Sequence, residues 1–245
     1  MKIIADYHTH TTFSHGSGSI EDNVKAAISK GLKTIAISDH GPGHAFYGIK
    51  KSRYKEMREE IDRLNELYPD IQILLGLEAN FMSVDGTIDV DDDMLEIADI
   101  IMCGYHFGSS PRKLLMDLKM HAYAILSKHS KGIYEKSKKL NTIMLINAMN
   151  RYDLTAITHP GAKGPIDVLA VAKVASEKNV ALEVNAKHGH LTVEEIKIAL
   201  QTDVKFILGS DAHDPENVGV FTESLNRCLE AGIPISRILN AEEAS

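Results

Sequence analysis

Short runs of apolar and β-branched residues alternate along this chain with longer segments that carry an apolar stripe at helical spacing. Seven of the runs have the length of a buried strand: residues 2–7, 34–38, 71–77, 100–105, 155–158, 180–184 and 205–208. The segments between them place apolar residues three and four positions apart, as in 20–30, 53–68, 168–178, 193–201 and 217–231. Repeated strand–helix units predict a parallel sheet covered by helices.

The number of these units limits the fold class. Seven or eight strand–helix units in 245 residues are more naturally closed into a barrel than left open, although periodicity alone also allows a doubly wound sheet. We therefore expect an α/β fold with a TIM-like (β/α)7 barrel. No linker-like stretch or repeat of fixed period divides the chain, so residues 1–245 are expected to form one domain. Two helix-like stretches, 114–127 and 134–149, predict an elaborated crossover at about 109–151, between the fourth and fifth strands.

The charge balance and the cysteines exclude several classes of protein. Lys and Arg total 27 against 34 Asp and Glu, and this formal net charge of −7 disfavours a broad surface for nucleic acid or anionic lipid. Cys103 and Cys228 are too few for a disulfide framework, and we expect Cys103 to act as a small buried hydrophobe. The opening residues fall far short of a signal peptide, so we expect a cytoplasmic protein with no membrane partner.

Histidine is abundant, with 12 residues in a chain that has no Trp. His8 and His10 follow the first predicted strand, and His15 lies in the same loop. Residues two apart in an extended backbone point to one side, so His8 and His10 can present imidazole nitrogens to one ion. Taken alone, the pair is equally well explained as two partly exposed loop histidines.

Residue types that bind metals recur where the other predicted strands end. Six of the seven strands are followed by such residues, which besides the first loop are His40, Glu78, His106, His159, Asp211 and His213. The carboxyl ends of the strands of a parallel barrel lie on one face, so these side chains are expected to converge there. Seven histidines and two carboxylates exceed the roughly three protein ligands of a catalytic zinc site, which predicts more than one ion.

These motifs, in this order, resemble those of the PHP (polymerase and histidinol phosphatase) family of metal-dependent phosphoesterases, above all its stand-alone bacterial phosphatases. The matching segments are Asp6-Tyr7-His8-Thr9-His10 with His15, Ser38-Asp39-His40-Gly41-Pro42, Glu78, Gly104-Tyr105-His106, Thr158-His159-Pro160-Gly161 and Ser210-Asp211-Ala212-His213. The resemblance implies a distorted seven-stranded barrel and three divalent metal ions, for which zinc, manganese and iron are all chemically suitable.

The family's ligand arrangement can be carried onto this sequence residue by residue. It implies one ion held by His8, His10, Glu78 and Asp211, a second that shares Glu78 and takes His106 and His159, and a third held by His15, His40 and His213. The activity implied is hydrolysis of small phosphomonoesters by a metal-activated hydroxide, without a side-chain nucleophile. Three dications would bring the formal charge to about −1, with the positive charge where phosphate docks.

Other residues are candidates for supporting roles. Asn185, Lys187, His188, Lys163 and Arg112 are expected to contact the substrate. Asp6 and Asp39 are candidates for orienting the ligating imidazoles or for plain capping of the loops.

Some histidines and carboxylates are interpreted without a ligand role. His44 is a candidate lid residue, His121 and His129 are expected on helix surfaces, and the acidic cluster 89–93 is expected to be a solvated helix start.

Three other functions remain open on the sequence. A phosphodiesterase or exonuclease acting on nucleic-acid ends would share the fold and the ions, but the net charge disfavours a long nucleic acid on the outer surface. A metal-dependent amidohydrolase also begins with His-x-His, but it usually has a bridging lysine where this chain has His106. A non-catalytic metal-binding scaffold is the third alternative, and the oligomeric state stays open.

Overall fold

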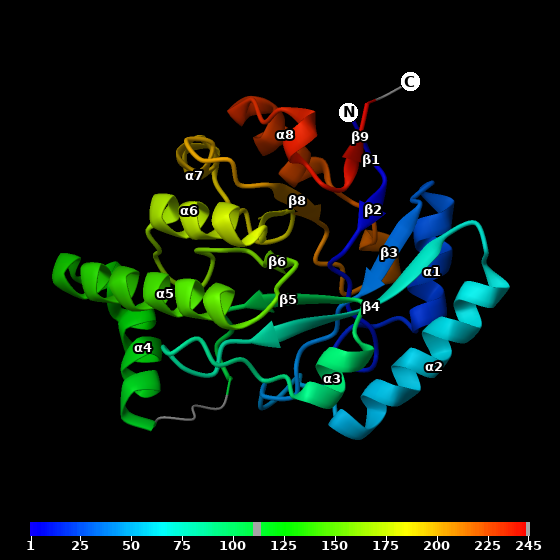
Figure 1. The fold of residues 1–245 in the computed structure, drawn as a ribbon, viewed down its shortest axis with the longest axis horizontal. Helices are drawn as coiled ribbons and strands as arrows, with labels where there is room; N and C mark the ends of the chain where they lie inside the picture. Colours follow the sequence, from blue (N-terminus) through cyan, green and yellow to red (C-terminus); the bar gives the residue numbers. More distant parts are fainter. Residues whose placement is uncertain (110–113, 244–245) are drawn as a thin grey trace.

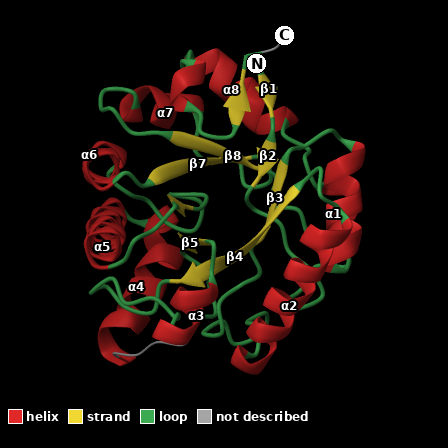
Figure 2. Ribbon diagram, turned by 45° about the vertical axis from the view of Figure 1, so that its right-hand side comes forward, coloured by secondary structure: helices red, strands yellow, loops and turns green. Residues whose placement is uncertain are grey.

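The computed structural model describes residues 1–109 and 114–243, and its centre is a curved sheet of parallel strands (Figures 1 and 2). The strands run in the order of the sequence: β2 (Ala5–Asp6), β3 (Thr34–Ile37), β4 (Gln72–Asn80), β5 (Ile100–Gly104), β6 (Ala156–Ile157), β7 (Ala181–Asn185) and β8 (Phe206–Gly209). A separate antiparallel pair joins β1 (Lys2–Ile3) to β9 (Ala241–Glu242). The sheet is nearly closed on itself, which confirms the predicted TIM-like barrel.

Helices cover the outside of the sheet, with α1 and α2 on one side and α5 and α6 on the other (Figure 2). Their bounds are α1 (Ile20–Ser29), α2 (Lys51–Leu67), α3 (Asp92–Ile97), α4 (Leu114–Leu126), α5 (Lys131–Arg151), α6 (Val168–Lys178), α7 (Val193–Ala199) and α8 (Thr222–Ala231). Three short 3-10 turns, η1 (Ser127–His129), η2 (Pro215–Asn217) and η3 (Ile235–Arg237), complete the described elements. No described helix has the length and apolar character needed to cross a membrane.

Local signals in the sequence explain several helix ends. Ser19 and Asp22 form a reciprocal capping box at the start of α1, and Gly232 ends α8 with a left-handed φ of 75°. The helix expected at 217–231 begins only at Thr222, because η2 occupies the preceding turn. The crossover between β5 and β6 contains α4 and α5, as expected, and Cys103 is fully buried.

The inward face of the barrel changes from apolar to acidic along the strands. Met102, Ala156, Ala181 and Ile207 form a small buried cluster inside it. Side chains alternate between the two faces of a strand, so Glu183 points inward like Ala181 two positions before it. Glu78 pairs with Met102 in the β4–β5 register and shares its inward face. The barrel therefore presents two fully buried carboxylates towards its carboxyl end.

Two features close the gap between the first and last strands of the sheet. Beyond the strand ends, Thr9 and Ala212 form a parallel bridge, with the His10 N–H donating to the Ala212 carbonyl over 2.8 Å. At the amino end, the buried Asn240 amide donates to the carbonyls of Ala5 and Leu208, each over 2.8 Å. Its Oδ1 accepts from the Leu208 N–H over 3.0 Å. One side chain thus joins β2 to β8.

Asn240→Ala is expected to destabilise the protein by about 2–4 kcal/mol, because it leaves three backbone groups without their partner in a buried seam. Chemical denaturation followed by circular dichroism measures the free energy of unfolding. Gln201→Ala, at an exposed position, should change it by less than about 0.5 kcal/mol. An Asn240→Ala protein as stable as the Gln201→Ala control would show that the barrel closes without this side chain.

Candidate metal centre

The carboxyl ends of the strands surround a cavity of about 250 Å³. Seven of the nine predicted ligands line it: His15, His40, Glu78, His106, His159, Asp211 and His213. His8 and His10 are buried beside them, with His8 Nε2 3.3 Å from Glu78 Oε2 and His10 Nε2 3.6 Å from Asp211 Oδ1. The structure therefore brings all nine predicted side chains together.

Glu78 is the centre of this group. Its Oε1 lies 2.9 Å from His159 Nε2 and 3.3 Å from His106 Nε2. Its Oε2 lies 3.0 Å from His40 Nδ1 and 3.3 Å from His8 Nε2. A carboxylate with different imidazoles at each oxygen has the geometry of a group that bridges two ions.

Asp211 organises the other side of the cavity. Its Oδ1 lies 3.3 Å from His213 Nδ1 and 3.6 Å from His10 Nε2, whereas Oδ2 lies 3.3 Å from His188 Nε2. Asp211 and His159 both have positive φ angles, 53° and 30°. Such backbone costs about 1–3 kcal/mol at a residue other than glycine and is concentrated at functional sites.

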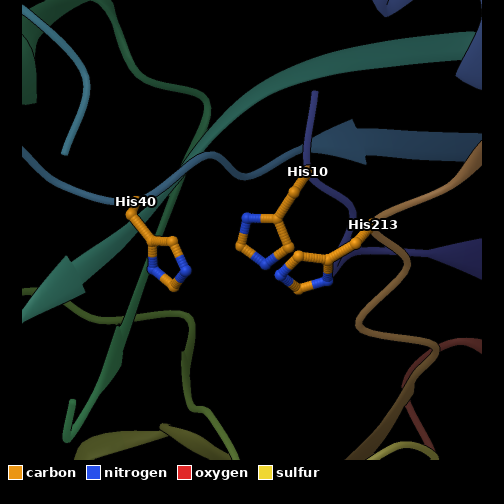
Figure 3. A group of neighbouring side chains, drawn as sticks. All are labelled: His10, His40 and His213. Atoms are coloured by element: carbon orange, nitrogen blue, oxygen red, sulfur yellow. The ribbon is translucent and has the colours of Figure 1, made fainter. Parts of the chain in front are cut away.

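Three histidines from separate parts of the chain point their rings towards one another in Figure 3. The ring centroid of His10 lies 4.5 Å from that of His40 and 4.3 Å from that of His213. His15 lies at the edge of this group, 4.2 Å from His213 and 4.8 Å from His40 between centroids. The rings are close enough to offer nitrogens to shared ions.

Donor atoms close enough to hold an ion fall into overlapping groups among the described residues. They are His10–His40–His213, His8–His10–Asp211, His40–Glu78–His106 and His159–His188–Asp211, each with all atoms within 4.8 Å of one another. His188 joins the last group, although the sequence interpretation placed it in substrate binding. His15 belongs to none of these groups.

Several buried donor atoms have no hydrogen-bond partner within the described part of the chain. They include His8 Nε2, both ring nitrogens of His10, His40 Nδ1 and Glu78 Oε2. His40 Nδ1 and Glu78 Oε2 are close, but they lack hydrogen-bond geometry. A buried polar atom without a partner costs about 1–3 kcal/mol, so these atoms fit divalent cations as their partners.

At Glu78, Asp211, His10 and His106 the electrostatics favour the protonation states that bind cations. Burial raises the pKa of the Glu78 carboxyl, but the imidazoles that face it, led by His106, hold it well below its usual range. Burial also raises the pKa of the Asp211 carboxyl, but neighbouring groups, led by the imidazole of His8, hold it well below its usual range. Burial lowers the pKa of His10 and brings that of His106 to about 3. Ionised carboxylates beside neutral imidazoles are ready to ligate.

Glu183 fixes two of the histidines and was not predicted. Its Oε1 accepts from His8 Nδ1 over 2.7 Å, which turns the other ring nitrogen of His8 towards Glu78. Its Oε2 accepts from the His159 backbone N–H over 2.7 Å. Burial lowers the pKa of His8, but the surrounding carboxylates, Glu183 first, raise it well above its usual value. A cation binding there would displace a proton.

Asn80 and Asp89 fix a third histidine. Asn80 Oδ1 accepts from His106 Nδ1 over 2.9 Å, and its amide donates to Asp89 Oδ2 over 2.6 Å. The expectation of a solvated helix start at 89–93 is therefore wrong for Asp89, which is buried, but it is confirmed for the rest: Asp91 caps α3, and Asp92 and Asp93 are exposed in its first turn. The buried carboxylate of Asp89 also accepts from the Gly43 N–H over 2.7 Å.

Asp6 and Asp39 orient loops rather than imidazoles. The carboxylate of Asp6 accepts from the backbone N–H groups of His8, Ser210 and Gly219, over 3.3, 3.3 and 2.8 Å. Asp39 accepts from the Thr11 N–H over 2.8 Å and the Thr11 hydroxyl over 2.6 Å. Neither carboxylate hydrogen-bonds an imidazole of the described residues, because Asp6 binds the backbone of the segments that follow β2 and β8, and Asp39 binds the loop that follows β2.

The candidates for substrate contact separate into two groups. Lys163, Lys187 and His188 line the cavity. Asn185 is instead fully buried, where its amide donates to Glu183 Oε2 over 3.0 Å and its oxygen accepts from two backbone N–H groups. Its position therefore corrects the predicted substrate contact. Arg112 lies outside the described residues.

The three histidines kept out of the ligand set have different surroundings. His44 lines the cavity, but it is buried and ties two loops: Nδ1 accepts from the N–H of Tyr47 over 3.1 Å, and Nε2 donates to the Phe107 carbonyl over 3.0 Å. His121 is half-buried against the Tyr105 hydroxyl, 2.8 Å away, rather than on an open helix surface. His129 is exposed, as expected.

Known proteins are similar to this chain in sequence or in fold. A probable phosphatase of Shewanella pealeana is 31% identical over 257 residues, covering 98% of this chain and 89% of the relative. A probable phosphatase of Proteus mirabilis is 30% identical, with 96% and 89% covered. The crystal structure of histidinol phosphate phosphatase from Lactococcus lactis, complexed with zinc, L-histidinol and phosphate, has a TM-score of 0.62 at 15% identity and 94% coverage of both chains.

The match to a family model shows most directly to which family the chain belongs. The model of the PHP domain matches residues 6–190, about three quarters of the chain, and this range includes seven of the nine predicted ligands. Together with relatives at 30% identity or more that align over nearly the whole sequence, this match shows that the chain belongs to the PHP domain family.

Proposed function

We propose that this protein is a phosphatase that hydrolyses small phosphomonoesters at a site with three divalent metal ions. The observation that carries the proposal is the convergence of seven imidazoles and two carboxylates, several with unpartnered buried donor atoms, below one small cavity. The names of the relatives and the zinc, L-histidinol and phosphate in the Lactococcus lactis enzyme support it.

The proposed ligand sets follow the family arrangement. One ion takes His8, His10, Glu78 and Asp211, a second shares Glu78 and takes His106 and His159, and a third takes His15, His40 and His213. The two-sided contacts of Glu78 support its bridging role. Zinc, manganese and iron all suit imidazole and carboxylate ligands. When bound, such ions neutralise phosphoryl charge and activate water for attack on phosphorus.

The chain's own cations would complete the recognition of the phosphoryl group. Lys163 and Lys187 line the cavity, and Lys187 Nζ lies 3.5 Å from Asp211 Oδ1. A lysine can donate up to three hydrogen bonds to phosphoryl oxygens. Glu183, Asn80 and Asp39 would hold the histidine rings and the first loop in place while the substrate binds. The cavity of about 250 Å³ has room for a phosphoryl group.

The test is to assay a panel of phosphomonoesters and phosphodiesters with metal analysis of the same purified sample. We expect bound divalent metal and hydrolysis of monoesters, with activity lost after treatment with a chelator and restored by added metal. Hydrolysis confined to diesters would favour a nuclease-type function. Full activity in a metal-free preparation would contradict the proposed mechanism.

Removing a ligand should remove both metal and activity. His10→Ala and Asp211→Asn are each expected to lower the bound metal and to reduce kcat/KM by ~100-fold or more, because the transition-state charge loses a preorganised partner. His129→Ala is the matched control, since this histidine is exposed on η1. Metal content by mass spectrometry and phosphate release measure the two effects. Normal metal content and turnover in both ligand variants would exclude these assignments.

Glu183→Gln tests the support of the histidines. Glu183 Oε2 now accepts from the His159 N–H and from the Asn185 amide. If the NH2 group of a glutamine took the place of this oxygen, it would face those two donors and could accept from neither. We expect metal affinity to fall by about 10–100-fold, the effect of losing a group that orients a ligating histidine. Titration with a competing metal chelator measures the affinity. Glu177→Gln, an exposed change on α6, should leave the affinity unchanged, and equal affinities in both variants would exclude the role of Glu183.

A further inference from the structure

His188 lies in the loop that follows β7 and lines the same cavity as the proposed metal ligands. Its Nε2 lies 3.3 Å from Asp211 Oδ2, and its ring centroid lies 5.0 Å from that of His159. One donor atom from each of these three residues falls within 4.8 Å of the other two. Two ligand atoms that bind one zinc ion at about 2.1 Å in tetrahedral geometry lie roughly 3.4 Å apart. His188 and Asp211 already have this separation.

Asp211 presents its two oxygens to different imidazoles. Oδ1 lies 3.3 Å from His213 Nδ1, whereas Oδ2 faces His188. The Asn185 amide also donates to Oδ2 over 3.2 Å, but an ionised carboxylate oxygen has two lone-pair positions, so one remains for a cation. Glu78 has the same two-sided surroundings. Asp211 therefore has the geometry of a second bridging carboxylate, with His188 beside its second oxygen.

The loop that carries His188 is held by hydrogen bonds that do not involve the His188 ring. The backbone N–H groups of Lys187 and His188 both donate to Asn185 Oδ1, over 2.9 and 2.7 Å. The Asn185 N–H donates to the His190 carbonyl over 2.6 Å, which closes the loop. Arg227 on α8 donates to the Asn185 carbonyl at the start of the loop. The backbone therefore places the imidazole at the cavity, and the ring can be removed without breaking these bonds.

The charge beside His188 distinguishes two possible roles. Its Nε2 faces an oxygen of Asp211, which is almost completely buried. A phosphoryl oxygen that accepted a hydrogen bond from this nitrogen would lie close to that carboxylate, and the two negative charges would repel each other. A divalent cation between the imidazole and the carboxylate would instead be attracted by both groups. The position of His188 therefore favours a metal ligand over a contact with the substrate.

We propose that His188 is a tenth ligand of the metal centre and binds the ion that His159 binds, with Asp211 Oδ2 as a further donor. The inference rests on the three-ion site of the proposed function. Imidazole nitrogen and carboxylate oxygen suit zinc, manganese and iron alike. Without this addition the ion has only Glu78, His106 and His159 as protein ligands, so His188 strengthens the binding of one ion among the three.

Metal titrations of a variant test the inference. Metal-free protein is titrated with zinc in competition with a chromophoric chelator. His188→Ala is expected to weaken the binding of one ion by about tenfold or more, at least the effect of losing a group that orients a ligand. The other two affinities should stay within about twofold. In the fully cobalt-loaded protein, the visible absorption should also change, because it reports the ligands of the ion.

His190→Ala is the matched control for this variant. It removes the same kind of side chain from the same loop, at nearly the same exposure: 28% for the His190 side chain against 27% for that of His188. The carbonyl of His190, and not its ring, closes the loop, so the substitution keeps that hydrogen bond. Zinc affinities and the cobalt spectrum are expected to equal those of the unchanged protein.

Chemical modification gives a measurement on the unchanged protein, which does not depend on whether a variant folds. Diethyl pyrocarbonate acylates imidazole nitrogens that are accessible and free. We expect His188 to react in the metal-free protein and to be protected by zinc alone, without phosphate. His190 and the exposed His129 should react in both states. Mass spectrometry of the peptides gives the extent of reaction at each histidine.

The outcomes separate the inference from the proposed function. Unchanged metal affinities in His188→Ala together with weaker inhibition by inorganic phosphate would assign His188 to the substrate and overturn the inference. Equal losses of affinity in His188→Ala and His190→Ala, or protection of His188 that requires phosphate, would also overturn it. An unchanged protein that binds no divalent metal would overturn the three-ion site itself. Bound metal without hydrolysis of any phosphomonoester would overturn the phosphatase function and leave His188 as a ligand.

Discussion

The complete burial of the Glu78 carboxylate at the end of a parallel barrel is the constraint on which the site depends. A buried carboxylate is strongly unfavourable unless positive charge or hydrogen bonds surround it. Here imidazoles approach both oxygens, and Thr158 donates to Oε1 over 2.7 Å. The barrel provides this crowding because its strands converge there. The carboxylate also needs a glycine beside it, because a Cβ at position Gly104 would lie only 2.8 Å from Glu78 Oε1.

Closure of the barrel and construction of the site are therefore linked. The bridge between Thr9 and Ala212 that joins the first and last strand ends lies between His8 and His10 on one side and Asp211 and His213 on the other. Glycine acts here too, since a Cβ at Gly209 would lie only 1.9 Å from Glu183 Oε1. The packing that completes the fold therefore also sets the spacing of the side chains that could bind metal. The backbone, and not only these side chains, holds the site in its geometry.

The sequence predicted the barrel and the nine converging side chains, because these residues lie near the carboxyl ends of recognisable strands or in the loops that follow them. Glu183, Asn80 and Asp89 could not be predicted in this way. Glu183 sits within an apolar strand, and its partners His8 and His159 are distant in the sequence, so only the closed barrel reveals them. For Asp6 and Asp39 the residue types were recognised, but hydrogen bonding to the nearby loop backbone took precedence over contact with a ring. Asn185 was misassigned because the strand continues through it and buries it.

The hydrogen bonds of His44 join the two loops at the mouth of the cavity. A single neutral imidazole connects the loop that follows β3 to the loop that follows β5, since it accepts from the Tyr47 N–H and donates to the Phe107 carbonyl. Tyr47 in turn stacks on His15, with ring centroids 4.3 Å apart. A chain of contacts through His44 and Tyr47 therefore links Phe107, on the outer wall of the cavity, to an imidazole of the candidate metal site. The position of the His15 ring therefore depends on the loop that carries Tyr47 as well as on its own loop, so the rim and the floor of the cavity are built together.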